Sequence, residues 1–107
     1  MSGLYTFGDW YVKPGAENRF VDAWNEFAQW SIADLPGATY AKLLQDQSDA
    51  RRFVSFGPWR DEDAVAEWRA HPGFQERVEL LQEHLESFSP ATMVVAAEVG
   101  PVTPDPW

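Results

Sequence analysis

Residues 57–74, GPWRDEDAVAEWRAHPGF, set the order of elements in this chain. Trp59 closes a run of strand-forming residues, and a helix is predicted over residues 61–70. Asp61 can cap that helix, because its carboxylate accepts hydrogen bonds from the free amides of the first turn. Pro72 ends it and suits the start of another helical segment. The stretch therefore predicts a strand, a short helix and a further helix in succession.

Four more segments lie upstream and complete the first part of the pattern. Residues 4–12 and 51–59 are rich in aromatic and β-branched side chains, which predicts strands. Residues 38–46 predict a strand that forms a hairpin with 51–59 through the turn QSDA. A helix is predicted over residues 17–33, because one apolar stripe recurs there at steps of four, three and four: Phe20, Trp24, Phe27 and Ser31.

The C-terminal part predicts one more helix and one more strand. Helical spacing continues from Pro72 to about residue 88 through Phe74, Val78, Leu81, Leu85 and Phe88. Residues 91–99 predict the last strand, and the three prolines of residues 101–107 predict an irregular tail. Residues 1–100 therefore predict a single α+β domain with the ferredoxin-like βαββαβ order, in which helices cover one face of a four-stranded antiparallel sheet.

Composition narrows the classes of partner and chemistry. The chain has 17 acidic and 8 basic residues, a net charge of −9, and its arginines are scattered among acids, so nucleic acid and membranes are not expected as partners. It has no cysteine, which excludes thiolate chemistry, and no cluster of metal ligands or Ser-His-Asp spacing. We expect no metal site. No signal peptide or long apolar run is present, which predicts a cytoplasmic protein.

Alternation along the strands predicts a sheet that is apolar on both faces. In the first strand, Tyr5, Phe7 and Tyr11 share one face, and Trp10 and Val12 share the other. The last and third strands show a similar pattern. Helices cover only one face, and monomers rarely expose a large apolar patch, so the sequence predicts a homodimer that buries the open sheet face.

The layout resembles the antibiotic biosynthesis monooxygenase family over about residues 4–99. The resemblance is carried by KPGAENRFVDAW at the first helix, LPG after it, and WRDEDAVAEWRAHPGF after the third strand. It implies a dimeric α+β barrel with a pocket between sheet and helices in each subunit. Characterised members oxidise aromatic polyketide phenols or anthrones to quinones with molecular oxygen and no prosthetic group, and others bind and degrade haem.

The family's functional residues carry over only in part. In quinone-forming relatives an Asn on the third strand precedes a Trp at the strand end; Trp59 matches that Trp, and Ser55 stands in place of the Asn. In haem-degrading relatives Trp68 matches a Trp of the second helix. Residues 8–9 stand near the position of an Asn on the first strand, and Val78 stands near that of the haem-ligating His.

The resemblance implies cofactor-independent oxidation of a small, electron-rich aromatic substrate, which is chemically possible because a phenolate can itself reduce oxygen. The candidate catalytic residues are Trp59, Trp68, Ser55 and His71, the last because imidazole titrates near neutrality. The candidate substrate-binding residues are Tyr40, Arg52, Tyr11 and Trp24, which supply hydrogen bonds, charge and an apolar wall. No cofactor is expected.

Each candidate also has a structural interpretation. The tryptophans can be core residues, and the tyrosines can lie at the rim of an interface. His71 can be a solvated or capping residue, and Arg52 can pair with Asp46 or Asp49 at the surface. Two other functions stay open: a haem-binding or haem-degrading protein, and a non-catalytic ligand-binding or cyclase dimer of the same fold.

Overall fold

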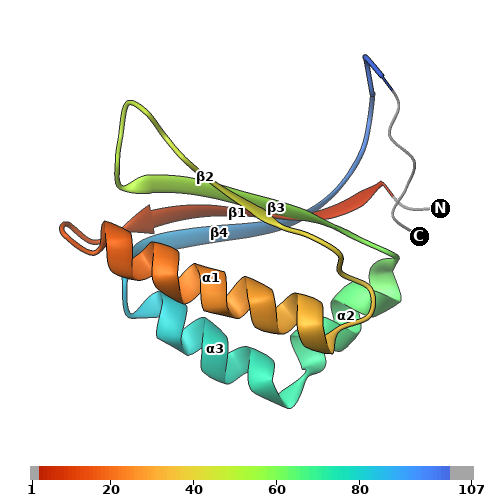
Figure 1. Ribbon diagram of the computed structural model, residues 1–107, viewed down its shortest axis with the longest axis horizontal. Helices are drawn as coiled ribbons and strands as arrows, with labels where there is room; N and C mark the ends of the chain where they lie inside the picture. Colours follow the sequence, from red (N-terminus) through yellow and green to blue (C-terminus); the bar gives the residue numbers. More distant parts are fainter. Residues whose placement is uncertain (1–2, 102–107) are drawn as a thin grey trace.

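A four-stranded antiparallel sheet is covered on one face by three helices, as expected for a ferredoxin-like α+β fold (Figure 1). The computed structural model describes residues 3–101; residues 102–107, which form most of the predicted tail, lie outside the described residues. The strand order is β2-β3-β1-β4. The elements are β1 (Leu4–Val12), α1 (Glu17–Asp34), β2 (Lys42–Gln45), β3 (Arg52–Trp59), α2 (Glu62–Ala70), α3 (Pro72–Gln82) and β4 (Leu85–Val94).

The main core lies between α1 and the central strands. The buried side of α1 is the stripe predicted from the sequence, namely Phe20, Trp24, Phe27 and Ser31. Phe20 is fully buried, with its ring centroid 5.3 Å from that of Trp10 on β1 and 5.2 Å from that of Phe53 on β3. Burying a side chain of this size stabilises the fold by roughly 1.5–3 kcal/mol, so this cluster fixes α1 on the sheet.

The junction of α2 and α3 is fixed by two capping side chains. Asp61 accepts a hydrogen bond of 2.8 Å from the backbone amide of Ala64, which confirms the predicted cap. That bond lowers the pKa of the Asp61 carboxyl below its ordinary value. His71 ends α2 and caps α3, since its Nδ1 accepts from the amide of Gly73 at 2.9 Å. Pro72 opens α3, where its missing amide hydrogen costs nothing.

The boundary between α3 and β4 differs from the sequence prediction. The helix stops at Gln82 instead of running to Phe88, and the strand spans Leu85–Val94 instead of 91–99. Pairing with β1 explains the early stop, because Leu85 pairs with Val12 and Phe88 with Trp10, so this backbone bonds to a neighbouring strand and not within a helix. β4 lies at the sheet edge, where Pro90 is tolerated. Phe88 therefore belongs to a strand and stacks on Trp10 at 4.0 Å between ring centroids.

β2 is shorter than its predicted span of 38–46. Residues 38–41 instead run close beside β3, where Ala38 forms an isolated bridge with Trp59. A Cβ atom at Gly57 would lie 2.6 Å from the carbonyl oxygen of Tyr40, so only glycine permits this approach. The segment closes one side of the space beneath the sheet.

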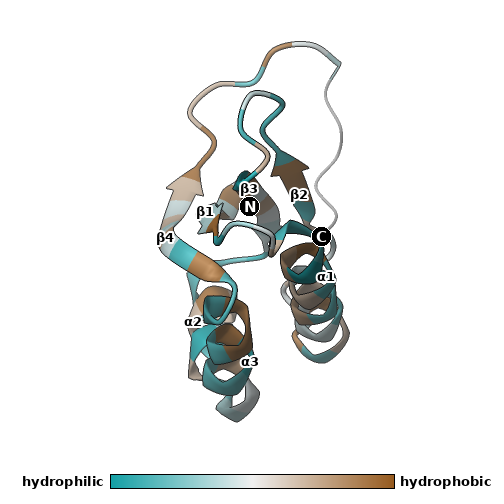
Figure 2. Ribbon diagram, turned by 90° about the vertical axis from the view of Figure 1, so that its left-hand side faces the viewer, coloured by the Kyte–Doolittle hydropathy of each residue, from teal (hydrophilic) through white to brown (hydrophobic). Residues whose placement is uncertain are grey.

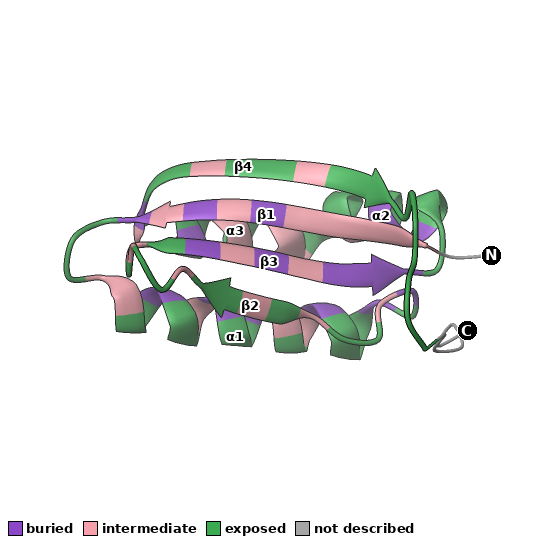
Figure 3. Cartoon of the chain, turned by 90° about the horizontal axis from the view of Figure 1, so that it is seen from above, coloured by how far each residue is buried: buried purple, intermediate pink, exposed green. Residues whose placement is uncertain are grey.

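The sheet face opposite the helices is apolar at one end and charged at the other. Cross-strand register places Tyr5, Phe7, Phe56 and Met93 together near the end where β1 begins, as the alternation predicted for β1 and β3. Met93 is 48% exposed. Viewed onto this face, most of β4 is exposed and the central strands are more covered (Figure 3). No helix among residues 3–101 is both long and apolar enough to cross a bilayer.

Candidate active site between the sheet and the helices

A cavity of about 500 Å³ separates the sheet from the helices. It exists because the middle of the two central strands carries small side chains on the helix-facing side. Larger rings, those of Trp10, Phe53 and Trp59, occupy the same face toward the strand ends. The small residues are Thr6, Gly8, Ser55 and Gly57.

Aromatic rings from all three helices form the opposite wall of the cavity. Trp68 of α2 lies at their centre, with its ring centroid 4.8 Å from that of Trp59, 5.7 Å from Phe27 and 4.9 Å from Phe74. Figure 2 shows α1 on one side beneath the sheet and α2 and α3 on the other. Rings from both sides therefore enclose the space under the strands, and this apolar wall suits a flat aromatic ligand.

Three indole N–H groups around the cavity each donate to a hydroxyl oxygen. These bonds are Trp10 to Ser55 at 2.8 Å, Trp59 to Thr6 at 2.9 Å and Trp68 to Ser31 at 2.9 Å. Ser31 in turn donates its hydrogen to the carbonyl of Phe27 at 2.8 Å. Within residues 3–101 the hydroxyl groups of Ser55 and Thr6 donate to no protein atom, so both are free to donate to a ligand oxygen.

Gly8 makes room for the bond between Trp10 and Ser55. A Cβ atom at this position would lie 2.7 Å from Nε1 of Trp10 and 2.9 Å from the Ser55 hydroxyl oxygen. Both distances are shorter than real contacts allow, so the indole folds back over the strand only because residue 8 has no side chain.

The described cavity wall contains very little charge. It includes no carboxylate and no imidazole, and its ionisable side chains are Tyr40 and Arg69. Tyr40 lies on the segment before β2 and is 42% exposed. Arg69 lies at the end of α2 and donates to the hydroxyl of Thr92 on β4 at 3.2 Å. Among residues 3–101, no group of three His, Cys, Asp or Glu side chains could hold a metal ion.

Five of the residues predicted for the site line this one cavity. They are Trp59, Trp68, Ser55, Tyr40 and Trp24. The structure brings them together from β3, α2, α1 and the segment before β2. Trp59 and Trp24 therefore have both roles, since they are buried in the core and also line the cavity.

The other three predicted residues lie elsewhere. His71 caps α3 and packs edge-on against Trp30, with ring centroids 5.0 Å apart, outside the cavity wall. Arg52 and Tyr11 lie on the sheet face that points away from the helices. The geometry therefore gives these three no direct contact with a ligand in the cavity.

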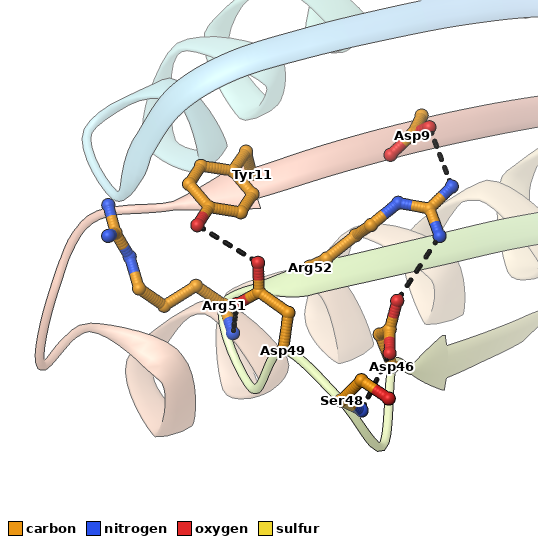
Figure 4. A network of polar contacts seen from close by, with 7 residues as sticks. All are labelled: Asp9, Tyr11, Asp46, Ser48, Asp49, Arg51 and Arg52. Atoms are coloured by element: carbon orange, nitrogen blue, oxygen red, sulfur yellow. Dashed lines mark hydrogen bonds and ion pairs between the residues drawn. The ribbon is translucent and has the colours of Figure 1, made fainter.

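Arg52 and Tyr11 belong to a polar network on that outer face (Figure 4). Arg52 pairs with Asp9 at 3.0 Å and with Asp46 at 3.4 Å, so the expected Asp46 pair is present and Asp9 joins it. Tyr11 donates to Asp49 at 3.0 Å, and this bond raises the pKa of its hydroxyl. Both side chains have structural partners here.

Sequence reasoning missed several groups in the wall. Thr6 and Gly8 alternate with Trp10 on the helix-facing side of β1, and that alternation signals their position once the sheet is assumed. Ser31 stands out as the polar member of an otherwise aromatic stripe. Arg69 gave no comparable signal, because its partner Thr92 lies 23 positions away in the chain.

Comparisons with known proteins agree with this geometry. Residues 6–80 match the family described as antibiotic biosynthesis monooxygenase. No curated protein sequence matches the chain.

Several solved structures share the fold at low sequence identity. They include a variant of SnoaB, a cofactor-independent oxygenase from Streptomyces nogalater (TM-score 0.81, 21% identity, 92% of this chain and 99% of that chain). A structure described as an antibiotic biosynthesis monooxygenase gives TM-score 0.74 and 22% identity over 88% of this chain and 99% of that one. PA3566 from Pseudomonas aeruginosa gives TM-score 0.75 and 18% identity over 91% of this chain and 97% of that one.

The crowding at Gly8 generates a test of the cavity geometry. We expect Gly8→Ala to displace the Trp10 indole from Ser55 and to lower the free energy of unfolding by about 1–3 kcal/mol, as overpacking does. Urea unfolding and tryptophan fluorescence measure both effects. Adding Trp10→Phe removes the indole atoms that the new methyl group meets, so the double variant should lose less than the sum of the single losses. Additive losses would contradict this geometry.

Proposed function

This chain belongs to the antibiotic biosynthesis monooxygenase family, and we propose that it uses molecular oxygen, without a cofactor, to oxidise an electron-rich aromatic such as a polyketide phenol, anthrone or quinol. The observation that carries the proposal is the aromatic-walled cavity of about 500 Å³, with the Ser55 and Thr6 hydroxyls free to donate into it. The shared fold with SnoaB, described as a cofactor-independent oxygenase, supports the same proposed function.

The chemistry rests on the substrate as its own reductant. Loss of a proton gives a phenolate or enolate, which passes one electron to oxygen far more readily than the neutral ring does. The resulting radical pair combines through a new C–O bond to give a peroxide, and cleavage of its O–O bond releases water and leaves a carbonyl. For an anthrone, the CH₂ carbon and O₂ become C=O and H₂O. One oxygen atom enters the product and the other leaves as water.

In this reaction the protein binds and orients the substrate and stabilises its anion. The rings of Trp24, Trp59 and Trp68 exclude water and hold a flat ring system. Donors fixed in an apolar space stabilise developing charge more strongly than water does. The Ser55 hydroxyl is fixed in this way, because its oxygen already accepts from Trp10 while its hydrogen stays free. Ser55 therefore replaces, by a hydroxyl donor, the Asn that the family resemblance places at this position.

The cavity wall does not fit haem. It contains no imidazole, and Val78, which stands near the position of the haem-ligating His, lines the wall as an apolar side chain. Methionine and cysteine are absent from the wall too. Tyr40 is a lining side chain of a type that can ligate haem iron, but it is 42% exposed and lies on the segment before β2. The wall therefore lacks the histidine ligand that the haem-degrading relatives use.

We also propose that two copies associate through the open sheet face. This face carries a cluster of apolar side chains on three adjacent strands, made up of Tyr5, Phe7, Phe56, Pro58, Ala91 and Met93. An apolar surface of this kind is stabilised when a second copy covers it. The charged network at the other end of the face would limit how the two sheets align.

Two serines provide a matched test of the donor role. Each accepts one indole N–H, but only Ser55 keeps a hydroxyl hydrogen free for a ligand. We expect Ser55→Ala to lower kcat for anthrone oxidation by about 100-fold, the loss typical of a removed oxyanion donor. Ser31→Ala should lose a similar amount of stability and much less activity. Oxygen uptake and thermal unfolding measure the two effects, and equal loss of kcat in both variants would contradict the donor role.

The absence of a carboxylate or imidazole from the described cavity wall predicts an unusual pH dependence. Activity should rise as the substrate ionises, so its midpoint should follow the pKa of each member of a series of phenols or anthrones. Hydrogen bonds favour the anion, so the midpoint of kcat should lie below the pKa of the free substrate. A midpoint near neutrality shared by all substrates would instead indicate a protein base.

Association through the sheet can be tested with two exposed apolar residues. Met93 on the open face and Leu80 on α3 are 48% and 52% exposed. We expect sedimentation at micromolar concentration to show a dimer for the unmodified chain and for Leu80→Glu, and a monomer for Met93→Glu, since a buried unpaired carboxylate is strongly unfavourable. A monomeric unmodified chain would contradict the proposal.

A further inference from the structure

Arg69 is an exposed residue of α2 that lines the cavity. Among the described lining residues no other lysine, arginine or histidine is present. The guanidinium reaches from the last turn of α2 to the Thr92 hydroxyl on β4, at 3.2 Å. This hydrogen bond joins α2 to β4, and both of its residues line the cavity.

The charge of Arg69 is not balanced by a carboxylate in the described part of the chain. The ion pairs found among residues 3–101 belong to Arg51, Arg52 and Arg60. Arg19 and Arg77 also form no ion pair within residues 3–101, so Arg69 differs from them by its place in the cavity wall. A guanidinium has five N–H donors, and Thr92 accepts from one nitrogen. Donors for a second, anionic partner therefore stay available.

Arg69 and Ser55 lie at different ends of the same cavity. Ser55 on β3 faces Gly8 across the β1–β3 ladder, whereas Thr92 on β4 faces Thr6 across the β1–β4 ladder. Because β1 separates the two strands and their partners on β1 are two residues apart, the backbones of Ser55 and Thr92 lie about 12 Å apart. This separation is comparable with the length of three fused six-membered rings. One ligand can reach both polar ends while its rings fill the apolar middle.

We propose that Arg69 is a specificity-determining residue that selects aromatic substrates bearing a carboxylate at the end of the ring system opposite the oxygen held by Ser55. A carboxylate accepts two parallel hydrogen bonds from a guanidinium, and Thr92 can keep its own bond and orient the group. The substrate class is then a fused-ring aromatic acid. The inference deepens the proposed function and depends on it for the reacting end, but the anion contact itself involves no oxygen chemistry.

Unreactive quinones test the contact apart from turnover. Anthraquinone-2-carboxylate and its methyl ester have the same rings and differ in charge, and quenching of tryptophan fluorescence reports their binding. We expect the unmodified protein to bind the acid at least about tenfold more tightly than the ester at low salt. Arg69→Gln should abolish this preference and leave ester affinity unchanged, and Arg69→Lys should keep part of it.

Arg19→Gln is the matched control, because it makes the same change in net charge at an exposed position of α1. It should retain the full preference. The inference is overturned by equal affinity for acid and ester in the unmodified protein, by a preference that survives Arg69→Gln, or by an equal loss in Arg19→Gln. Tighter binding of ionised 2-hydroxyanthraquinone than of the acid would also overturn it, since the anion would then be a phenolate.

Oxygen uptake with an anthrone is measured separately, so loss of oxidation contradicts the proposed function and loss of the acid preference contradicts only this inference.

Discussion

The site depends on three indole N–H groups that are each bound to a hydroxyl. A buried N–H without a partner costs free energy, so each indole is held where its acceptor lies. Trp10 is held over Gly8 by Ser55, and Trp68 is held against α1 by Ser31. The rings are consequently fixed as walls and do not collapse into the space above the small residues of β1 and β3. A cavity of about 500 Å³ in a chain of 107 residues follows from this arrangement.

The two faces of the sheet carry different physical chemistry. The helix-facing side is apolar, with hydroxyl donors and one cation, Arg69, among the described lining residues. The opposite side holds the ion pairs of Arg52 with Asp9 and Asp46, next to an apolar patch (Figure 4). Exposed ion pairs of this kind contribute little to stability. No carboxylate lines the described part of the cavity, where an anionic intermediate would form.

The spacing of apolar side chains predicted much of this architecture. Contacts between segments far apart in the chain determined the rest. The stripe of α1 and the two faces of β1 followed from side-chain spacing alone. The end of α3 did not, because Leu81, Leu85 and Phe88 fit a helical step, whereas residues from Leu85 onward pair with β1. Trp59 and Trp68 were expected in the site from the family resemblance, and Trp24 was a candidate from the stripe of the first helix. Capping was one of the two structural interpretations of His71, and the structure confirms it. The contact of Arg69 with Thr92 joins segments 23 positions apart and was not predicted.

The most direct test of the account is a crystal structure of the protein with an anthraquinone bound. The account predicts one ligand per chain beneath the central strands, with its rings against Trp59 and Trp68 and a quinone oxygen within hydrogen-bond distance of the Ser55 hydroxyl. A ligand on the open sheet face, or indoles that have moved to fill the cavity and leave no room for it, would contradict the account.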